Sequence, residues 1–359
     1  MQKQIFGAFL QNEKNPLSRI SQANSCISLD PFTGCSLGCV YCYRHNSKRD
    51  NNSFIPKRLF SDEEIIKALI NHPYFIPNKT IIGIGVASTD AFLPKVENSS
   101  FNIMNILSKK GYKNPFWFVI KSGIPKKSSK KFKNIINRGN HIIFSISYSG
   151  MPKIVEPFSG NRFNNIDEAI EAGASVSLHL RPLVLGWNDD YKNLERVIKK
   201  GIANGCTSVC YGGLRFLDGI EKAITQRYGL AFPKINKNEL MKTMPIEIEQ
   251  NIKNIFKKHD YHIPLFSHSS EVISHYLGIK DYNMNALRGR DYFLKINEKD
   301  ANTLGLNNDS IKILIQQAID ELKINSKVFK KGDKYFLSKR INYIEERALI
   351  HRLSFYNFL

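Results

Sequence analysis

At 359 residues, the chain is long enough to bury a large core, either as one barrel-sized domain or as two smaller domains. Its composition, 42% hydrophobic and 23% charged, is typical of a soluble globular protein, and no apolar run reaches the roughly 18 residues that cross a bilayer. The N-terminus lacks a basic start followed by a long apolar stretch, so the sequence predicts a cytoplasmic protein with no membrane association.

The net charge of +20 raises the question of a nucleic-acid partner. Lysine outnumbers arginine by more than two to one, however, and enrichment in Lys, Asn and Ile indicates an A+T-rich coding sequence. Arginine, the better bidentate phosphate ligand, gathers only at Arg288 and Arg290. The densest lysine run, residues 126–134, falls on an expected helix surface. Charge alone therefore leaves a nucleic-acid partner open.

Short β-branched apolar runs alternate with segments of helical periodicity along the first two thirds of the chain. Strands are expected at 25–29, 80–86, 116–120, 141–147, 175–181 and 207–212. Helices are expected at 61–72, with a capping box formed by Ser61 and Glu64, and near 100–110, 127–138, 165–173 and 190–203. Such units predict parallel strands joined by right-handed crossovers.

We therefore expect an α/β fold, a partial (β/α)6 TIM-like barrel over residues 25–285 that follows an N-terminal extension at 1–24. A seventh strand is a candidate at 263–268. Residues 286–359 differ in character: 309–325 has a helical pattern, and 326–340 predicts a hairpin that turns at Lys331-Gly332-Asp333. This C-terminal α+β extension resembles a small winged helix.

Three of the six cysteines, Cys35, Cys39 and Cys42, lie within eight positions. In a chain of this length they form a poor disulfide framework and a good ligand set. A structural zinc ion would take four protein ligands, with His45 as the fourth. An iron–sulfur cluster also suits thiolates, and three cysteines would leave one iron open to a substrate or cofactor.

The residues around the cysteines favour the iron–sulfur cluster. Gly34 and Gly38 let the backbone fold closely around a bulky group, and Tyr41 and Tyr43 supply an aromatic wall that could lie beside an adenine. The loop also follows the first predicted strand. In a barrel the active site gathers at the carboxyl ends of the strands, where a structural zinc is seldom found.

The C-x-x-x-C-x-x-C loop, with an aromatic residue before its third cysteine, resembles that of radical S-adenosylmethionine (SAM) enzymes. "LDPFTGCSLGCVYCY", "STDAFLP", "VIKSG", "IFSIS", "IVEP" and "YGGLR" occur in the order seen in the spore photoproduct lyase-like branch, over about residues 25–285. The resemblance implies a [4Fe–4S] cluster whose open iron binds SAM. It also implies a 5′-deoxyadenosyl radical that abstracts hydrogen from substrate, and a flavodoxin- or ferredoxin-type electron donor.

The same resemblance places four further residues at SAM. Thr89 and Asp90 match residues that line the SAM pocket, and Lys121 and Ser145 match contacts to its carboxylate or ribose. Each has a simpler alternative: helix capping for Thr89 and Asp90, a solvated charge for Lys121, and an ordinary strand serine for Ser145.

Arg181 and Arg215 lie near strand ends. Either arginine could bind a carboxylate of SAM or of the substrate through two hydrogen bonds. Salt bridges that close the barrel are the alternative.

One departure from the spore photoproduct lyases concerns the hydrogen donor. Their cysteine in the "STD" region corresponds to Ala87 here, so lesion repair by that route is not expected. Cys206 and Cys210, four residues apart, are expected to share a strand face, with Cys210 nearer the mouth as candidate donor. Tyr211 and Tyr148 compete with it. The alternative is that both cysteines are inert core residues.

His268 and His275, with Glu271 between them, could share a helix face and bind a metal, but a pocket or structural role is favoured. The function expected is that of a radical SAM enzyme acting on a small molecule or peptide. A nucleic-acid substrate is the first alternative. The second is a binding protein whose metal centre has no catalytic role.

Overall fold

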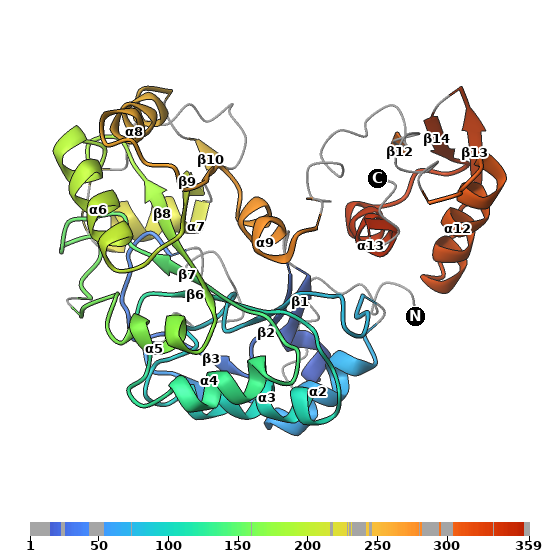
Figure 1. Cartoon of the computed structure of the whole chain (residues 1–359), viewed down its shortest axis with the longest axis horizontal. Helices are drawn as coiled ribbons and strands as arrows, with labels where there is room; N and C mark the ends of the chain where they lie inside the picture. Colours follow the sequence, from blue (N-terminus) through green and yellow to red (C-terminus); the bar gives the residue numbers. More distant parts are fainter. Residues whose placement is uncertain are drawn as a thin grey trace.

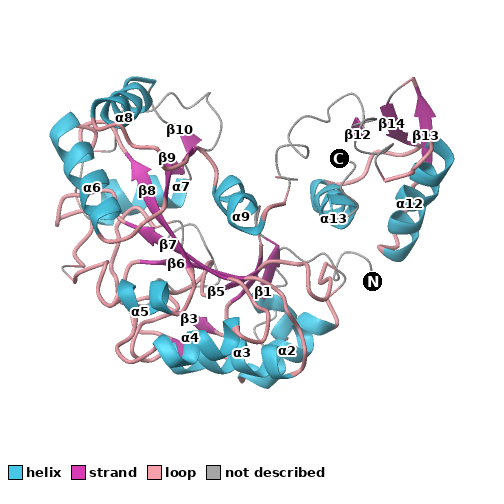
Figure 2. Cartoon of the chain, in the orientation of Figure 1, coloured by secondary structure: helices cyan, strands magenta, loops and turns pink. Residues whose placement is uncertain are grey.

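The computed structural model describes residues 15–22, 26–42, 54–72, 74–158, 160–215, 218–227, 229, 231, 242–243, 246–279, 281, 294–295, 304–332 and 334–354. Strands and helices alternate in the expected order (Figures 1 and 2). The strands are β2 (Ile27–Leu29), β5 (Ile82–Ile84), β6 (Phe116–Ile120), β7 (Ile142–Ser147), β8 (Ser175–Leu183) and β9 (Ser208–Arg215). The helices between them are α2 (Asp62–Ile70), α3 (Glu97–Lys109), α4 (Ser129–Ile136), α5 (Ile166–Glu171) and α6 (Tyr191–Ala203).

These six strands form a parallel sheet in which spatial order follows chain order, β2-β5-β6-β7-β8-β9. β11 (Leu265–Phe266) pairs in parallel with β9, which confirms the seventh strand. Antiparallel strands β1 (Ile20–Gln22) and β10 (Lys242–Thr243) flank β2 and β9. The mixed α/β class and the parallel sheet are therefore confirmed. Curvature into a partial barrel stays a prediction.

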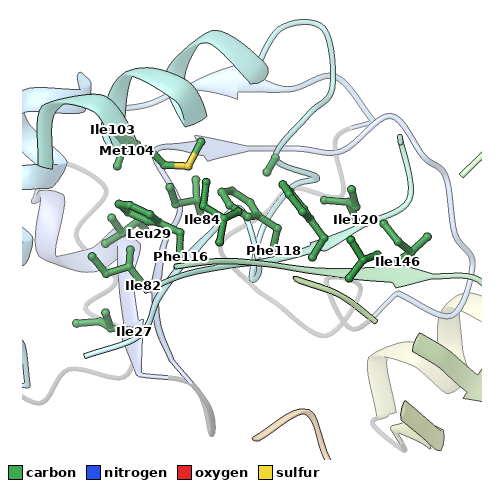
Figure 3. Packing of buried hydrophobic residues seen from close by; sticks show 14 of the residues in the cluster. Ile27, Leu29, Ile82, Ile84, Ile103, Met104, Phe116, Phe118, Ile120 and Ile146 are labelled. Atoms are coloured by element: carbon green, nitrogen blue, oxygen red, sulfur yellow. The ribbon is translucent and has the colours of Figure 1, made fainter. Parts of the chain in front are cut away.

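One face of the sheet carries the main hydrophobic core. Alternate side chains of β6, Phe116, Phe118 and Ile120, point to the same side as Ile146 of β7 and meet α3 through Met104 (Figure 3). Figure 1 shows α2 to α6 arranged along this side. Because side chains alternate along a strand, the residues between these positions face the other way.

The opposite face is polar toward the carboxyl ends of its strands and is covered at the amino ends by α9 (Ser269–Leu277). Ile273 of α9 packs with Trp117 and Ile143, which lie near the amino ends of β6 and β7. The Tyr276 hydroxyl donates to the Val176 carbonyl, at 2.8 Å, and lies 2.9 Å from Ser208 Oγ. α9 therefore closes the amino end of this face, and the carboxyl end holds the predicted motifs.

The expected capping box at the start of α2 is present. Ser61 Oγ accepts from the Glu64 amide at 3.2 Å, and Glu64 Oε2 accepts from the Ser61 amide at 2.8 Å. The remaining elements of the main part are short or lie outside the sheet: η1 (Pro16–Arg19), β3 (Phe32–Thr33), β4 (Lys57–Arg58), α7 (Asp218–Lys222), η3 (Ala223–Arg227) and α8 (Ile246–Lys258). None of the helices that can be described is both long and apolar enough to cross a membrane.

The C-terminal extension contains the expected helix and hairpin. α12 (Asn308–Glu321) precedes β13 (Val328–Lys331) and β14 (Lys334–Leu337), and β12 (Leu294–Lys295) adds a third strand. The last helix, α13 (Tyr343–Ser354), contacts the segment between α2 and β5. There the His351 ring stacks on Tyr74 with centroids 4.1 Å apart, and its Nε2 lies 3.0 Å from Thr80 Oγ1. Likeness to a winged helix stays a prediction.

Candidate cluster and cofactor site

The three clustered cysteines lie on one loop that follows β3. Gly34 and Gly38 adopt φ values of +85° and +69°, a left-handed conformation that favours glycine, so both are needed to fold the loop. The Cys42 amide donates to the Cys39 carbonyl at 3.2 Å and closes a turn between the last two cysteines. The conformation of the loop therefore agrees with the expectation that Gly34 and Gly38 let its backbone fold closely.

The cysteine loop sits in an apolar cluster with Leu37 and Val40. Burial raises the pKa of the Cys39 thiol to about 12, while the positive charge of Lys121 acts in the opposite direction. Negative charge on Cys42 and Cys35 also raises this pKa. The three side chains thus share one electrostatic environment, and none of the six cysteines forms a disulfide.

No set of three or more Cys, His, Asp or Glu side chains is positioned to hold one metal ion together, within the ranges that the structure describes. The donor chemistry nevertheless fits an iron–sulfur cluster, because three thiols lie on one glycine-shaped loop beside a cation. His45 and Tyr43 fall outside the described residues, so the zinc alternative keeps its fourth ligand only as a prediction.

The "IVEP" segment supports this loop from one side. The Val40 amide donates to the Val155 carbonyl at 3.0 Å, and a Cβ added to Gly38 would lie 3.5 Å from Pro157 Cγ. Between these two contacts, the Tyr41 hydroxyl donates to the buried Glu156 carboxylate. A segment far along the chain therefore fixes the residues between the second and third cysteines.

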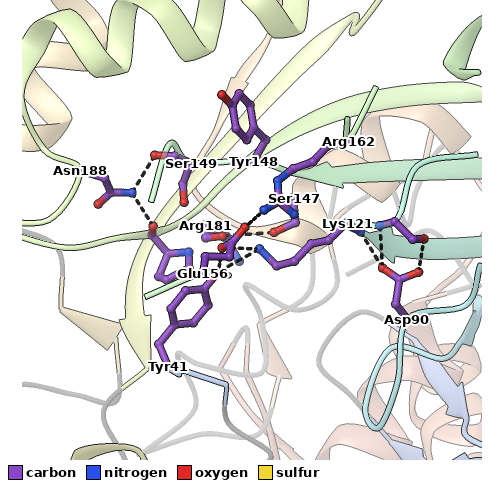
Figure 4. Close-up of polar contacts among 12 residues, drawn as sticks. Tyr41, Asp90, Lys121, Ser147, Tyr148, Ser149, Glu156, Arg162, Arg181 and Asn188 are labelled. Atoms are coloured by element: carbon purple, nitrogen blue, oxygen red, sulfur yellow. Dashed lines mark hydrogen bonds and ion pairs between the residues drawn. The ribbon is translucent and has the colours of Figure 1, made fainter. Parts of the chain in front are cut away.

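Glu156 joins two cations and a phenol in a buried network (Figure 4). Lys121 Nζ lies 3.0 Å from Glu156 Oε2 and 2.9 Å from the Tyr41 hydroxyl oxygen, and Arg162 donates to Glu156 Oε1. The Lys121 side chain is only 14% exposed, so the alternative of a solvated charge is wrong. With two cations and one carboxylate, the network carries one positive charge in excess beside the cysteine loop.

The pKa values follow from this arrangement. Burial alone would raise the pKa of Glu156. The charges of Lys121 and Arg162 more than offset this effect and lower the pKa below its usual range, so the carboxyl is ionised. Burial raises the pKa of Tyr41 well above its ordinary value, and the charges of Cys39 and Glu156 add to that effect. Tyr41 therefore stays a neutral hydrogen-bond donor.

Asp90 ties the loop after β5 to the loop after β6. Its carboxylate accepts from the Lys121 amide at 2.6 Å, from the Ser122 amide at 3.2 Å and from Ser122 Oγ at 2.6 Å. Helix α3 begins at Glu97 with Val96 as its N-cap, so the helix-capping alternative for Thr89 and Asp90 is wrong. In the described part of the chain, the buried Thr89 Oγ1 has no hydrogen-bond partner, which suits a hydroxyl that awaits a ligand.

Two further buried charged residues, Asp30 and Arg19, position the same β5 loop. Asp30 accepts from the Ala87 amide at 3.1 Å and the Ser88 amide at 2.8 Å. Arg19 donates to Ser88 Oγ at 2.7 Å and to the Phe32 carbonyl at 2.7 Å. Arg19 and Asp30 therefore link the start of the cysteine loop to the "STD" segment, and both side chains are buried.

Ser145 lies on the polar face of β7. Its Oγ accepts from Trp117 Nε1 at 2.8 Å, and the side chain is fully buried. This contact agrees with an ordinary strand serine, and its predicted role at SAM stays a prediction. Arg215 ends β9, but its side chain, like Tyr43, lies outside the described set.

The three candidate hydrogen donors do not share one face. Tyr211 packs in the helix-side core and bonds Glu249 of α8. The Tyr148 hydroxyl accepts from Arg196 of α6 at 3.0 Å, and its ring points away from Glu156 in Figure 4. Only Cys210, in register with His179 of β8, lies on the polar face.

The expectation that Cys206 and Cys210 share a strand face is wrong. β9 begins at Ser208, so Cys206 belongs to the preceding turn, and it packs in the helix-side core with Val209. Cys210 alternates with Val209 and Tyr211 and therefore faces the other side. Cys210 is fully buried, which also fits the inert alternative.

Arg181 of β8 links β9 to the segment that joins β11 to α9. Its guanidinium donates to the Tyr211 carbonyl at 3.0 Å, to the Ser267 carbonyl and to Ser269 Oγ at 3.1 Å. These contacts go to backbone carbonyls and a hydroxyl rather than to the carboxylates expected for salt bridges, and closure of a barrel stays a prediction. Glu271 caps α9 and pairs with His268 at 3.8 Å.

Sequence reasoning missed Glu156, Arg162, Asp30 and Arg19. In the sequence, Glu156 is identified only as part of the "IVEP" motif. The usable signal was charge: Glu156 follows Val155 and precedes Pro157 in a segment that has to pack on the cysteine loop, where an ionised side chain needs a partner.

No protein-family profile matches the chain, and no curated protein matches its sequence. Among solved structures, Streptococcus suis SuiB aligns with a TM-score of 0.44 and 10% identity over 74% of this chain and 56% of SuiB. SuiB bound to its precursor peptide SuiA gives 0.43 and 12%, over 74% and 55%. Methylornithine synthase (PylB) gives 0.39 and 14%, over 64% of this chain and 62% of that enzyme. The chain thus spans little more than half of SuiB, and likeness at this level transfers no function.

Proposed function

We propose that the protein is a radical SAM enzyme. The observation that carries the proposal is the cysteine loop itself, with three thiols on a glycine-shaped turn at the carboxyl edge of a parallel sheet. A buried network with one excess positive charge lies directly beside it. Such a charge favours thiolates and an anionic cofactor group at this position.

Cys35, Cys39 and Cys42 would hold a [4Fe–4S] cluster. When bound, the cluster and SAM supply an electron and a 5′-deoxyadenosyl radical that removes hydrogen from substrate. The chain's own residues position this pair: Glu156 holds Tyr41 and Lys121 beside the loop, and Asp90 fixes the Lys121 backbone. Thr89, whose buried hydroxyl has no hydrogen-bond partner among the described residues, is the residue we assign to a polar group of SAM.

We propose a small molecule or a peptide as the substrate. The polar face next to the loop presents Ser147, His179 and Cys210 in one row of the sheet. Hydroxyl, imidazole and thiol groups on neighbouring strands suit a substrate with several hydrogen-bonding groups. A nucleic-acid substrate is the second candidate, and the charge of the C-terminal sheet described below favours it.

Formation of 5′-deoxyadenosine tests this function. The protein, reconstituted with iron and sulfide and reduced, is expected to convert SAM to 5′-deoxyadenosine and methionine, and Cys39→Ala is expected to abolish the conversion. Cys206→Ala is the matched control, because it removes a buried thiol elsewhere. A wild-type protein that binds iron and yields no 5′-deoxyadenosine with any substrate candidate would support a metal centre without catalysis.

Cys210 is the donor that we propose for the return of a hydrogen atom to the product radical. Its S–H bond would break as the product C–H bond forms, and the flavodoxin- or ferredoxin-type donor with a solvent proton would restore the thiol. In deuterated water, product made by the wild type is expected to carry deuterium at the abstracted position. Cys210→Ala should lower product yield without lowering 5′-deoxyadenosine, whereas Cys206→Ala should change neither.

A further inference from the structure

The outer face of the C-terminal sheet carries a stacked pair of aromatic rings, of which Phe329 is exposed and Phe336 is half-buried. Phe329 of β13 lies directly opposite Phe336 of β14. Their rings stack with centroids 5.6 Å apart and planes 16° apart. Phe329 is 44% exposed, although the neighbouring Val328 and Tyr335 are buried on the inner face. Phe329, stacked on the half-buried Phe336, therefore presents an apolar ring to solvent.

A pair of lysines borders these aromatic rings. In the next row on the same face, Lys331 lies directly opposite Lys334. Like charges placed directly opposite each other disfavour strand pairing. Lys330, on the inner face, has instead a folding role, because it donates to Asn308 and lies 5.9 Å from the Tyr335 ring centroid.

The lysine run of α4 shows what a merely solvated basic surface looks like in this chain. There, Phe132 and Ile135 are buried while Lys130 and Lys133 are exposed, which is the ordinary amphipathic pattern of a surface helix. No apolar ring is exposed between those lysines as Phe329 is on the sheet. The outer face of the C-terminal sheet thus differs from the lysine-rich surface of α4, because it combines lysines with an exposed aromatic ring.

We propose that this face binds single-stranded nucleic acid. Unpaired bases stack on exposed aromatic rings such as Phe329, and the phosphates that join them match the two lysines that lie two residues farther along the same strands. Duplex bases are already stacked on one another and offer no ring face to Phe329. An acidic peptide would satisfy the lysines but leave the Phe329 ring exposed. RNA and DNA strands share the recognised chemistry.

This inference does not depend on the cluster or on SAM. If the proposed function is correct, the surface would hold a nucleic-acid substrate or a nucleic-acid-bound substrate near the enzyme. Binding by the sheet is measurable in the full chain without iron or SAM. A failure of radical chemistry and a failure of nucleic-acid binding are therefore separate results.

Fluorescence anisotropy with labelled oligodeoxythymidine and oligouridine tests the proposal on the full chain. Lys331→Gln with Lys334→Gln is expected to weaken binding at least ten-fold and to reduce the slope of log affinity against log salt by about 1.4. Phe329→Ala is expected to weaken single-strand binding about ten-fold. The matched control, Lys130→Gln with Lys133→Gln, removes equal charge and should change affinity less than two-fold. Circular dichroism checks that each variant is folded.

Any of four results would overturn the proposal. Equal losses for the two double variants would mean that only net charge attracts the strand. Duplex DNA bound as tightly as the single strand would show that binding does not depend on base stacking on the aromatic rings. Unchanged binding by Phe329→Ala would show the same. Polyglutamate that competes as well as oligouridine at equal charge would assign the face to acidic peptides. Preference for either the ribose or the deoxyribose strand supports the proposal and identifies the source.

Discussion

Two cations and the Tyr41 hydroxyl meet on the buried carboxylate of Glu156 beside the cysteine loop. Glu156→Gln would leave Lys121 and Arg162 buried without a compensating charge. We expect this change to lower the free energy of unfolding by about 3–5 kcal/mol, as for other broken buried pairs.

Urea denaturation of the iron-free protein measures this effect. Glu195→Gln is the matched control, since Glu195 pairs with Lys258 and His259 at the surface, and it should cost clearly less. Equal losses for the two variants would show that the Glu156 network contributes no more than a surface ion pair.

The identity of the metal ligands is a second prediction at the scale of single residues. Cys42→Ala is expected to lose the cluster, because only two thiolates remain on the loop. His45→Ala is expected to keep it. Iron content and the visible absorption spectrum after reconstitution measure both variants. Loss of iron in His45→Ala, with a four-ligand zinc site in the wild type, would make the histidine a ligand and contradict the open position.

Among the elements, the turn between α2 and β5 combines a buried histidine with the contact to α13. Burial lowers the pKa of His72 to about 4 from 6.5, and its Nδ1 accepts from the Tyr74 amide at 3.2 Å. Because the folded pKa lies below the unfolded one, stability is complete above pH 6.5 and is lost as the pH falls toward 4. Between pH 7.5 and pH 5 the loss is expected to be about 2 kcal/mol.

Urea unfolding at those two pH values tests this linkage. His72→Asn, which keeps an acceptor oxygen and removes the titrating group, is expected to lose less stability on acidification than the wild type. His262→Asn serves as control, because the His262 side chain is 84% exposed. The same acid sensitivity in His72→Asn as in the wild type would place its origin elsewhere.

The C-terminal hairpin should be more stable without its opposed lysines. Lys331→Thr removes one charge from the pair with Lys334 and is expected to raise the free energy of unfolding by about 0.2–1 kcal/mol at low salt. The gain should shrink at high salt, where such charges are screened. Lys327→Thr, at a position hydrogen-bonded to Ser338 across the hairpin, is the control and should give no gain.

The elements predicted from sequence agree with the structure where their pattern is local. The six strands, the first five helices and the hairpin turn each depend on periodicity, capping or turn residues. The face to which Cys210 and Tyr211 point was not predictable, because both faces of β9 are buried and its sequence shows no alternation. α9 was missed as a cover for the sheet, since its packing on Trp117 is a long-range contact.

At the scale of the whole molecule, the site is assembled from segments more than a hundred residues apart. The cysteine motif and its glycines are visible in the sequence. Tyr41 and Glu156 are 115 positions apart, and only folding of the "IVEP" segment onto the loop brings them together. Sequence motifs could therefore predict the candidate ligands of the site but not the ion pairs beside them.

The central claim is that three thiolates hold a four-iron cluster with one iron open to SAM. Electron paramagnetic resonance of the reduced, reconstituted protein tests it most directly, together with iron and zinc analysis. We expect about four irons per chain and a [4Fe–4S]⁺ signal that changes when SAM is added. One zinc per chain, or a cluster signal that SAM leaves unchanged, would contradict the claim.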